Sequence, residues 1–158
     1  MTSMYGSMGG SFSDAELATR KKVLTKKVIF ADTILHCVFT TPEYQQFANL
    51  IAKTSLAGKL NSRDAQFTIF IPMQTYTTLK DSYAIEKFVK SHMYSSIIPS
   101  NLLKSSKTLQ LKGNLNDMPV YSSSDGCSIQ VNGVNILQEE RVGKSILYLI
   151  EKPLFCTS

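Results

Sequence analysis

The apolar residues of the first half of the chain recur at helical intervals, whereas those of the second half alternate with polar residues. Near the N-terminus, apolar positions follow one another at intervals of seven, four, three and four residues, a helical pattern that Asp14 would cap. These positions are Leu17, Leu24, Val28, Ala31 and Leu35. Before them, residues 1–13 rely on Phe12 for bulky apolar surface, which is too little to offset the entropy of ordering them. We therefore expect a flexible N-terminal arm over residues 1–13.

Two further helices are predicted before Pro99. The first begins at residues 40–43, Thr-Thr-Pro-Glu, because a hydroxyl can cap a helix, proline fits its first turn and a carboxylate favours its positive end. Its buried positions would be Phe47, Leu50 and Ile51. We expect it to end near Gly58. The second helix spans residues 82–98 and ends at Pro99. Its apolar positions are Tyr83, Ile85, Phe88, Val89 and Met93.

The clearest strand signal is the β-branched and aromatic run of residues 67–71, Phe-Thr-Ile-Phe-Ile, which Pro72 stops. From Thr108 onward apolar and polar residues alternate, and a last apolar strand is expected at residues 145–150. Turns are predicted at Asp125-Gly126 and, as a tight hairpin, at Asn132-Gly133. Because helices come first and strands last, the order favours an α+β fold with an antiparallel sheet.

Four segments, in this order, resemble the signatures of the fasciclin-like adhesion domain, also called the fasciclin I-type domain. They are residues 47–60, residues 67–72 with Tyr76 at the family's aromatic position, residues 88–94 around His92, and residues 144–151. The resemblance covers about residues 28–156. It implies several helices packed against an antiparallel β-wedge or sandwich, and an adhesive rather than catalytic function.

The chain departs from the family at three of these positions. Ser91 stands where the family has the tyrosine of a Tyr-His pair, Tyr148 replaces a histidine and Glu151 replaces an aspartate. These changes bear on ligand binding rather than on the fold. The resemblance implies that His92 ties a helix end to neighbouring backbone, beside a region implicated in receptor binding. We favour a structural role for His92, because buried polar groups are nearly always hydrogen-bonded.

The length of the chain indicates a single domain, and its charge indicates a candidate binding surface. The whole chain has 158 residues and 43% hydrophobic content, which is sufficient for one domain. We expect this domain over residues 14–158, with its core over about residues 28–156.

The formal net charge of the chain is +5. One basic run stands out and is our candidate partner-binding surface: Arg20, Lys21, Lys22, Lys26 and Lys27. It suits an acidic protein face or nucleic acid, although a solvated helix face explains it equally well and no aromatic stacking platform accompanies it.

Residues suited to catalysis or metal binding are sparse. The two histidines, His36 and His92, lie in no nucleophile-elbow, His-Glu-X-X-His or phosphate-loop motif. Asp32 and His36 would share a helix face, but two ligands do not make a metal site. We therefore expect no enzymatic activity, no cofactor and no metal. The charged run of residues 139–141 is read as a solvated loop between two strands, with a partner contact as the alternative.

The three cysteines, Cys37, Cys127 and Cys156, are widely spaced, which favours free thiols in a reducing compartment. Residues 1–13 lack the basic and apolar regions of a signal peptide, no apolar segment approaches the ~20 residues of a membrane span, and no Asn-X-Ser/Thr acceptor occurs. These features predict a location inside a cell or within a virus particle.

The leading hypothesis is a non-enzymatic protein-interaction module that binds protein subunits in a homo- or hetero-assembly, for example as a component of a virus capsid. The first alternative is a cell-surface or extracellular adhesion protein exported without a recognisable signal peptide. The second is a nucleic-acid-binding protein that uses the basic run.

Overall fold

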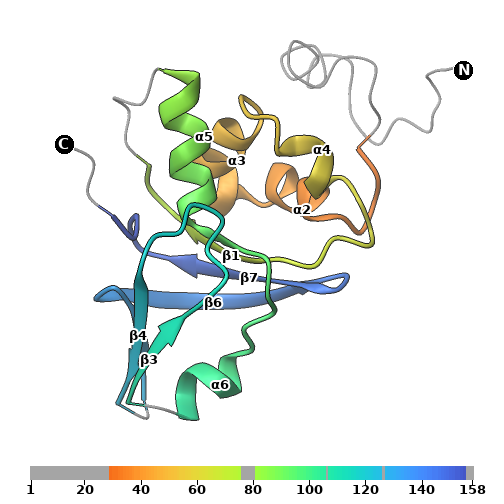
Figure 1. Cartoon of the computed structure of the whole chain (residues 1–158). Helices are drawn as coiled ribbons and strands as arrows, with labels where there is room; N and C mark the ends of the chain where they lie inside the picture. The colour runs from red at the N-terminus through yellow and green to blue at the C-terminus, as the bar shows by residue number, and fades with distance from the viewer. Residues whose placement is uncertain (1–28, 76–80, 106, 126, 156–158) are drawn as a thin grey trace, which may run out of the picture.

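The computed structural model describes residues 29–75, 81–105, 107–125 and 127–155. Figure 1 shows a group of helices lying on a strongly curled sheet, with one further helix on the opposite side. The predicted arm, most of the predicted N-terminal helix, the basic run and the positions of Tyr76, Gly126 and Cys156 lie outside the described residues.

The helices are short. They are α2 (Ile34–Thr40), the 3-10 helix η1 (Pro42–Tyr44), α3 (Gln45–Ile51), α4 (Ala57–Leu60), α5 (Ser82–Ser91) and α6 (Ser100–Ser105). No helix in the described part of the chain is both long and apolar enough to cross a membrane. Helices α2 to α5 pack together above strands β1 and β7, whereas α6 lies below the sheet (Figure 1).

The sheet has seven strands in the order β2-β1-β7-β6-β5-β4-β3. Their bounds are β1 (Thr68–Pro72), β2 (Met93–Tyr94), β3 (Thr108–Leu111), β4 (Val120–Ser124), β5 (Ile129–Val131), β6 (Val134–Val142) and β7 (Ser145–Ile150). The α+β class predicted from the sequence is confirmed. The sheet is mixed, however, because β1 and β7 run parallel while the other neighbouring strands are antiparallel.

Strands β1 and β7 separate two apolar cores. Ile69 and Leu147 face the helices in the first core, whereas Phe70 and Tyr148 face the second core inside the curled sheet. Every residue of both strands is buried, so both faces need apolar side chains. This explains why the two strands appear in the sequence as nearly continuous hydrophobic runs.

The curled sheet closes on itself at its two ends. Tyr94 of β2 forms a bridge with Asn114, which follows β3, and Leu115 N donates to Met93 O at 3.0 Å. Ser95 N donates to the oxygen of Gly113 at 3.1 Å. Closure satisfies backbone groups that would otherwise be exposed at the sheet edges.

The local turn and strand predictions agree closely with the structure. The predicted strand over residues 67–71 corresponds to β1, within one residue at each end. Asn132 and Gly133 form the two-residue hairpin turn between β5 and β6, with positive φ angles of 51° and 78°. Asp125 occupies a turn after β4, where its side chain accepts two backbone hydrogen bonds.

The predicted N-terminal helix is wrong over residues 29–33, although its last apolar position, Leu35, does lie in a helix. Residues 29–33 are not helical, and α2 begins only at Ile34. Asp32 has a φ angle of 62°, and the Thr33 side chain caps the helix by accepting from His36 N at 3.1 Å. A positive φ cannot continue a right-handed helix, so the apolar spacing at Ala31 was misleading.

The other two helix predictions err at their ends. Pro42 does begin a helix, but α3 stops at Ile51, and Gly58 lies inside the separate helix α4. The helix predicted over residues 82–98 ends at Ser91, since Met93 enters the sheet as part of β2. The charged residues 139–141 lie in strand β6 rather than in a loop.

Candidate functional site

His92 follows the last residue of α5 and is fully buried. Its Nε2 accepts a hydrogen bond from Leu154 N at 3.0 Å, and its Nδ1 lies 3.0 Å from Phe88 O. Because the amide of Leu154 can only donate, Nε2 must be the unprotonated nitrogen, and Nδ1 carries the proton that it donates to Phe88 O. His92 thereby joins the end of α5 to the C-terminal segment.

The surroundings of His92 keep it uncharged. The rings of Phe47, Phe88 and Phe155 lie 4.7–6.3 Å from its ring, centroid to centroid. Burial lowers the pKa of His92 from 6.5 to about 4, partly opposed by the hydrogen bond to Phe88. The structural role of His92 stays a prediction, and this geometry supports it.

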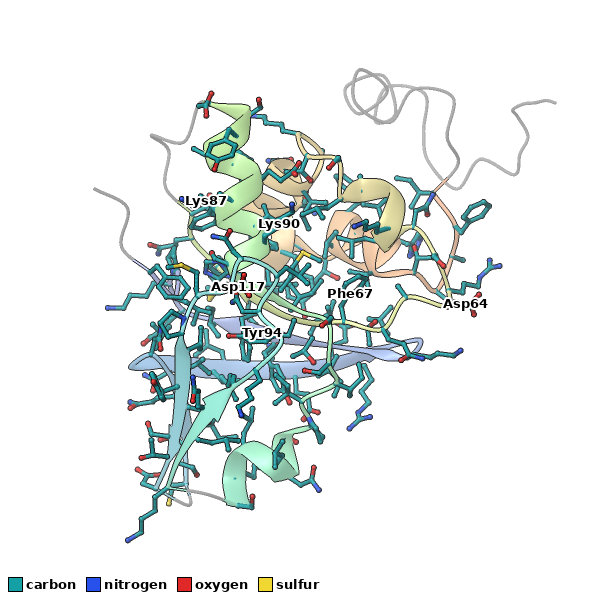
Figure 2. All side chains as sticks on the ribbon, viewed as in Figure 1. Asp64, Phe67, Lys87, Lys90, Tyr94 and Asp117 are labelled. Carbon is teal, nitrogen blue, oxygen red and sulfur yellow. The ribbon has the colours of Figure 1, made fainter. Side chains whose placement is uncertain are left out.

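Two of the residues that replace family positions, Ser91 and Tyr148, point inward, whereas Glu151 is exposed and accepts from Asn135 Nδ2 at 3.0 Å. Ser91 Oγ donates to Phe88 O at 2.6 Å, and Tyr148 OH donates to Ile98 O at 2.6 Å. Tyr94, labelled in Figure 2, belongs to the second core inside the curled sheet, where its ring lies 5.7 Å from that of Phe70. Its buried hydroxyl has no hydrogen-bond partner in the described part of the chain. Thus neither Ser91 nor Tyr94 presents a side chain to a partner at this surface.

The charged run in β6 makes a specific internal contact. Tyr44 OH donates to Glu140 Oε1 at 2.9 Å, joining the 3-10 helix to the sheet. Burial, and next the hydrogen bond to Glu140, raise the pKa of Tyr44. Burial, and next the charge of Glu140, raise the pKa of the nearby Cys37 thiol to about 11. Cys37 is therefore protonated and unreactive at neutral pH.

The possible metal pair does not form as expected. Asp32 lies in the turn before α2, so it does not share a helix face with His36. Within residues 29–75, 81–105, 107–125 and 127–155, no group of three or more His, Cys, Asp or Glu side chains could hold a metal ion. The expectations of no cofactor and no metal stay predictions.

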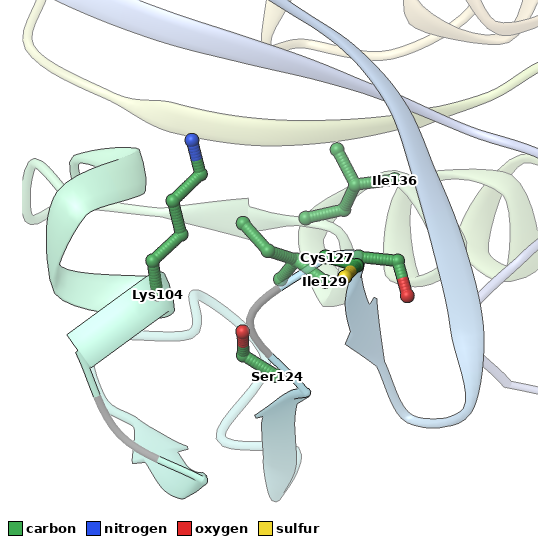
Figure 3. A pocket seen from close by; sticks show the side chains of 6 residues that line it. Lys104, Ser124, Cys127, Ile129 and Ile136 are labelled. Atoms are coloured by element: carbon green, nitrogen blue, oxygen red, sulfur yellow. The ribbon is translucent and has the colours of Figure 1, made fainter.

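A hollow of about 300 Å³ opens between α6 and the turn that joins β4 to β5 (Figure 3). It is lined by Lys104, Ser124, Cys127, Ser128, Ile129 and Ile136. Its volume is at the small end of the range for small-molecule sites, roughly 300–1,000 Å³. Sequence reasoning missed this hollow because separate segments build it. The predicted Asp125-Gly126 turn, adjacent to Cys127, was the one signal near it.

The comparisons with known proteins agree with this architecture. The family model described as "Fasciclin domain" matches residues 42–155. The FAS1 domain pair of the insect cell adhesion molecule fasciclin I has a similar fold, with a TM-score of 0.63 and 14% sequence identity. That similarity covers 78% of this chain but only 50% of the domain pair. No curated protein matches the sequence.

The chain belongs to the fasciclin domain family. The resemblance inferred from four short segments is therefore confirmed. The basic run at residues 20–27 lies outside both the family match and the described residues.

Proposed function

We propose that this chain is a non-enzymatic module that binds other proteins in the manner of an adhesion domain. The single observation that carries the proposal is the fasciclin domain match over residues 42–155. The structural relative, fasciclin I, is described as a cell adhesion molecule, which supports the same class of function. The two buried cores give the domain a fixed shape on which a binding surface can be presented.

The proposed contacts to neighbouring subunits come from residues 1–13 and from the basic residues Arg20, Lys21, Lys22, Lys26 and Lys27. The net charge of +5 supports an acidic partner surface, since positive potential speeds association with such a surface. We extend the proposal to an assembly component that acts inside a cell or within a virus particle such as a capsid.

Incorporation into the native assembly tests this proposal. The full chain and a variant lacking residues 1–27 are expressed in the native source, and the protein bound to each is quantified. We expect the deletion to reduce incorporation. A matched control replaces the exposed Lys59, Lys107 and Lys112 with glutamine, which removes positive charge elsewhere and should leave incorporation unchanged. Equal incorporation of the deletion variant would refute the role of the N-terminal residues.

The nucleic-acid-binding and surface-adhesion alternatives predict different results when the same protein from the native source is examined. A nucleic-acid-binding protein would lose its partner on nuclease treatment, and its affinity would fall steeply with salt. A surface adhesion protein would be labelled by a reagent that cannot enter cells. The interaction module proposed here retains its protein partner after nuclease treatment.

A further inference from the structure

We propose that the hollow between α6 and the β4–β5 turn binds a small aliphatic carboxylate. The Lys104 ammonium would pair with the carboxylate, and Ile129 and Ile136 would contact the aliphatic part. Figure 3 shows Lys104 on one side of the hollow, with Ile129, Ile136 and Cys127 on the other. This inference does not depend on the adhesion function proposed above.

The positive charge of Lys104 is available to a ligand. The ion pairs of the described residues involve Lys90, Arg141 and Lys144, and no carboxylate there lies within ion-pair distance of Lys104. The side chains of Ser124 and Ser128 line the same hollow. The Ser128 hydroxyl is already used, since Ser128 Oγ donates to Asp125 Oδ1 at 3.5 Å, so the Lys104 ammonium is the group that would bind a carboxylate.

The apolar side of the hollow is part of the protein core. Ile129 is only 9% exposed and belongs to the second core, against which the partly buried Ile136 also packs. These side chains are therefore held in place before a ligand arrives. An aliphatic group laid on them is removed from water, which is favourable in proportion to the apolar area covered.

The polar side is held by a local hydrogen-bond network. The Asp125 carboxylate accepts from the backbone N–H groups of Cys127 and Ser128, each at 2.8 Å. These hydrogen bonds, that of Ser128 foremost, lower the pKa of Asp125, so the carboxylate stays ionised and keeps both acceptor bonds at neutral pH. These bonds hold the backbone at Cys127 and Ser128, two of the residues that line the hollow, and groups held in advance reduce the entropy lost on binding.

The exposed thiol of Cys127 provides a direct reporter of occupancy. In a Cys156→Ser background, the rate of alkylation of Cys127 by iodoacetamide is measured by mass spectrometry at constant ionic strength. Cys37 serves as the internal control, because it is buried and unreactive. We expect isovalerate to slow the alkylation of Cys127, with half-protection at about 1–10 mM, the range reasonable for so small a ligand. Isovaleramide, its neutral isostere, should protect less.

The variant Lys104→Gln should weaken protection by isovalerate about two- to fivefold, the range for a solvent-exposed ion pair. In this variant isovalerate should protect Cys127 no better than isovaleramide does. Each rate is divided by the ligand-free rate of the same variant, so that an altered thiol reactivity does not mimic binding. Lys112→Gln is the matched control, since Lys112 is also exposed but does not line the hollow. Thermal unfolding of both variants checks that they are folded.

The carboxylate could be a free acid or the C-terminus of a peptide. Acetyl-Gly-Gly-Leu with a free C-terminus is therefore compared with isovalerate. Stronger protection by the peptide assigns the site to a peptide terminus, and stronger protection by isovalerate assigns it to a free acid. The proposal is overturned if neither protects Cys127, if isovaleramide protects as well as isovalerate, or if Lys104→Gln behaves as Lys112→Gln does.

Discussion

The burial of a neutral histidine makes the stability of this domain dependent on pH. His92 has a pKa of about 4 in the folded chain, against 6.5 as its ordinary value. The folded state therefore resists protonation that the unfolded chain accepts. The resulting stability is fully present above pH 6.5 and is lost as the pH falls toward 4. At 1.36 kcal/mol per pKa unit, the difference amounts to roughly 3 kcal/mol.

Protonation opposes folding here for a specific reason. A charged imidazole has no lone pair on Nε2, so the hydrogen bond from Leu154 N is lost and two donors face each other. The three phenylalanine rings around His92 offer no compensating negative charge. We expect the C-terminal segment at Leu154 and Phe155 to be among the first parts to loosen.

The assay is urea unfolding of the wild type and His92→Gln at several pH values between 4 and 7. His92→Gln should be less stable at pH 7 by about 1–3 kcal/mol, because glutamine lacks the ring that packs on three phenylalanines and holds its hydrogen-bonding groups in a different geometry. Its stability should fall less steeply than that of the wild type, so that the advantage of the wild type at pH 7 is lost or reversed toward pH 4, a relative change of roughly 3 kcal/mol. His36→Gln, which removes the only other histidine, should keep the steep fall of the wild type. Parallel curves for the wild type and His92→Gln would refute the reasoning.

Three further predictions concern other parts of the domain. Tyr44→Phe removes the hydrogen bond to Glu140 and should lower the free energy of unfolding in urea by about 1 kcal/mol; an unchanged value would contradict that contact. Gly133→Ala places a Cβ at a φ of 78° and should cost roughly 1–2 kcal/mol by the same measurement, whereas no loss would argue against the turn. In native protein, iodoacetamide should label Cys127 and leave Cys37 unlabelled by mass spectrometry, and equal labelling would be inconsistent with the burial of Cys37.

Features fixed by local chemistry could be predicted from the sequence. The β1 strand follows from a run of β-branched and aromatic residues, and the Asn132-Gly133 turn follows from two residues that tolerate positive φ. The family signatures add the order of the elements, which the fasciclin domain match confirms.

Features that depend on distant contacts could not be predicted. The parallel pairing of β1 with β7 joins strands with β2 to β6 between them in the chain, and no local pattern specifies it. The helix α5 stops early because Met93 and Tyr94 pair with β1 and close the sheet against Asn114. In that region tertiary packing overrides helical spacing.

The candidate sites likewise combine features that local sequence predicts with features that depend on distant contacts. The burial of His92 agrees with its position at a predicted helix end, but its bond to Leu154 joins residues 62 positions apart in the chain. The hollow beside Lys104 arises only when α6 and the β4–β5 turn come together. A basic run, by contrast, is visible in the sequence whether or not it binds anything.

The most direct test of the central claim is the amount of protein that remains bound to the full chain after purification from its native source with nuclease treatment. The account predicts a defined protein partner in near-stoichiometric amount, retained when nucleic acid is digested. Recovery of the chain alone, or of a partner released entirely by nuclease, would contradict it.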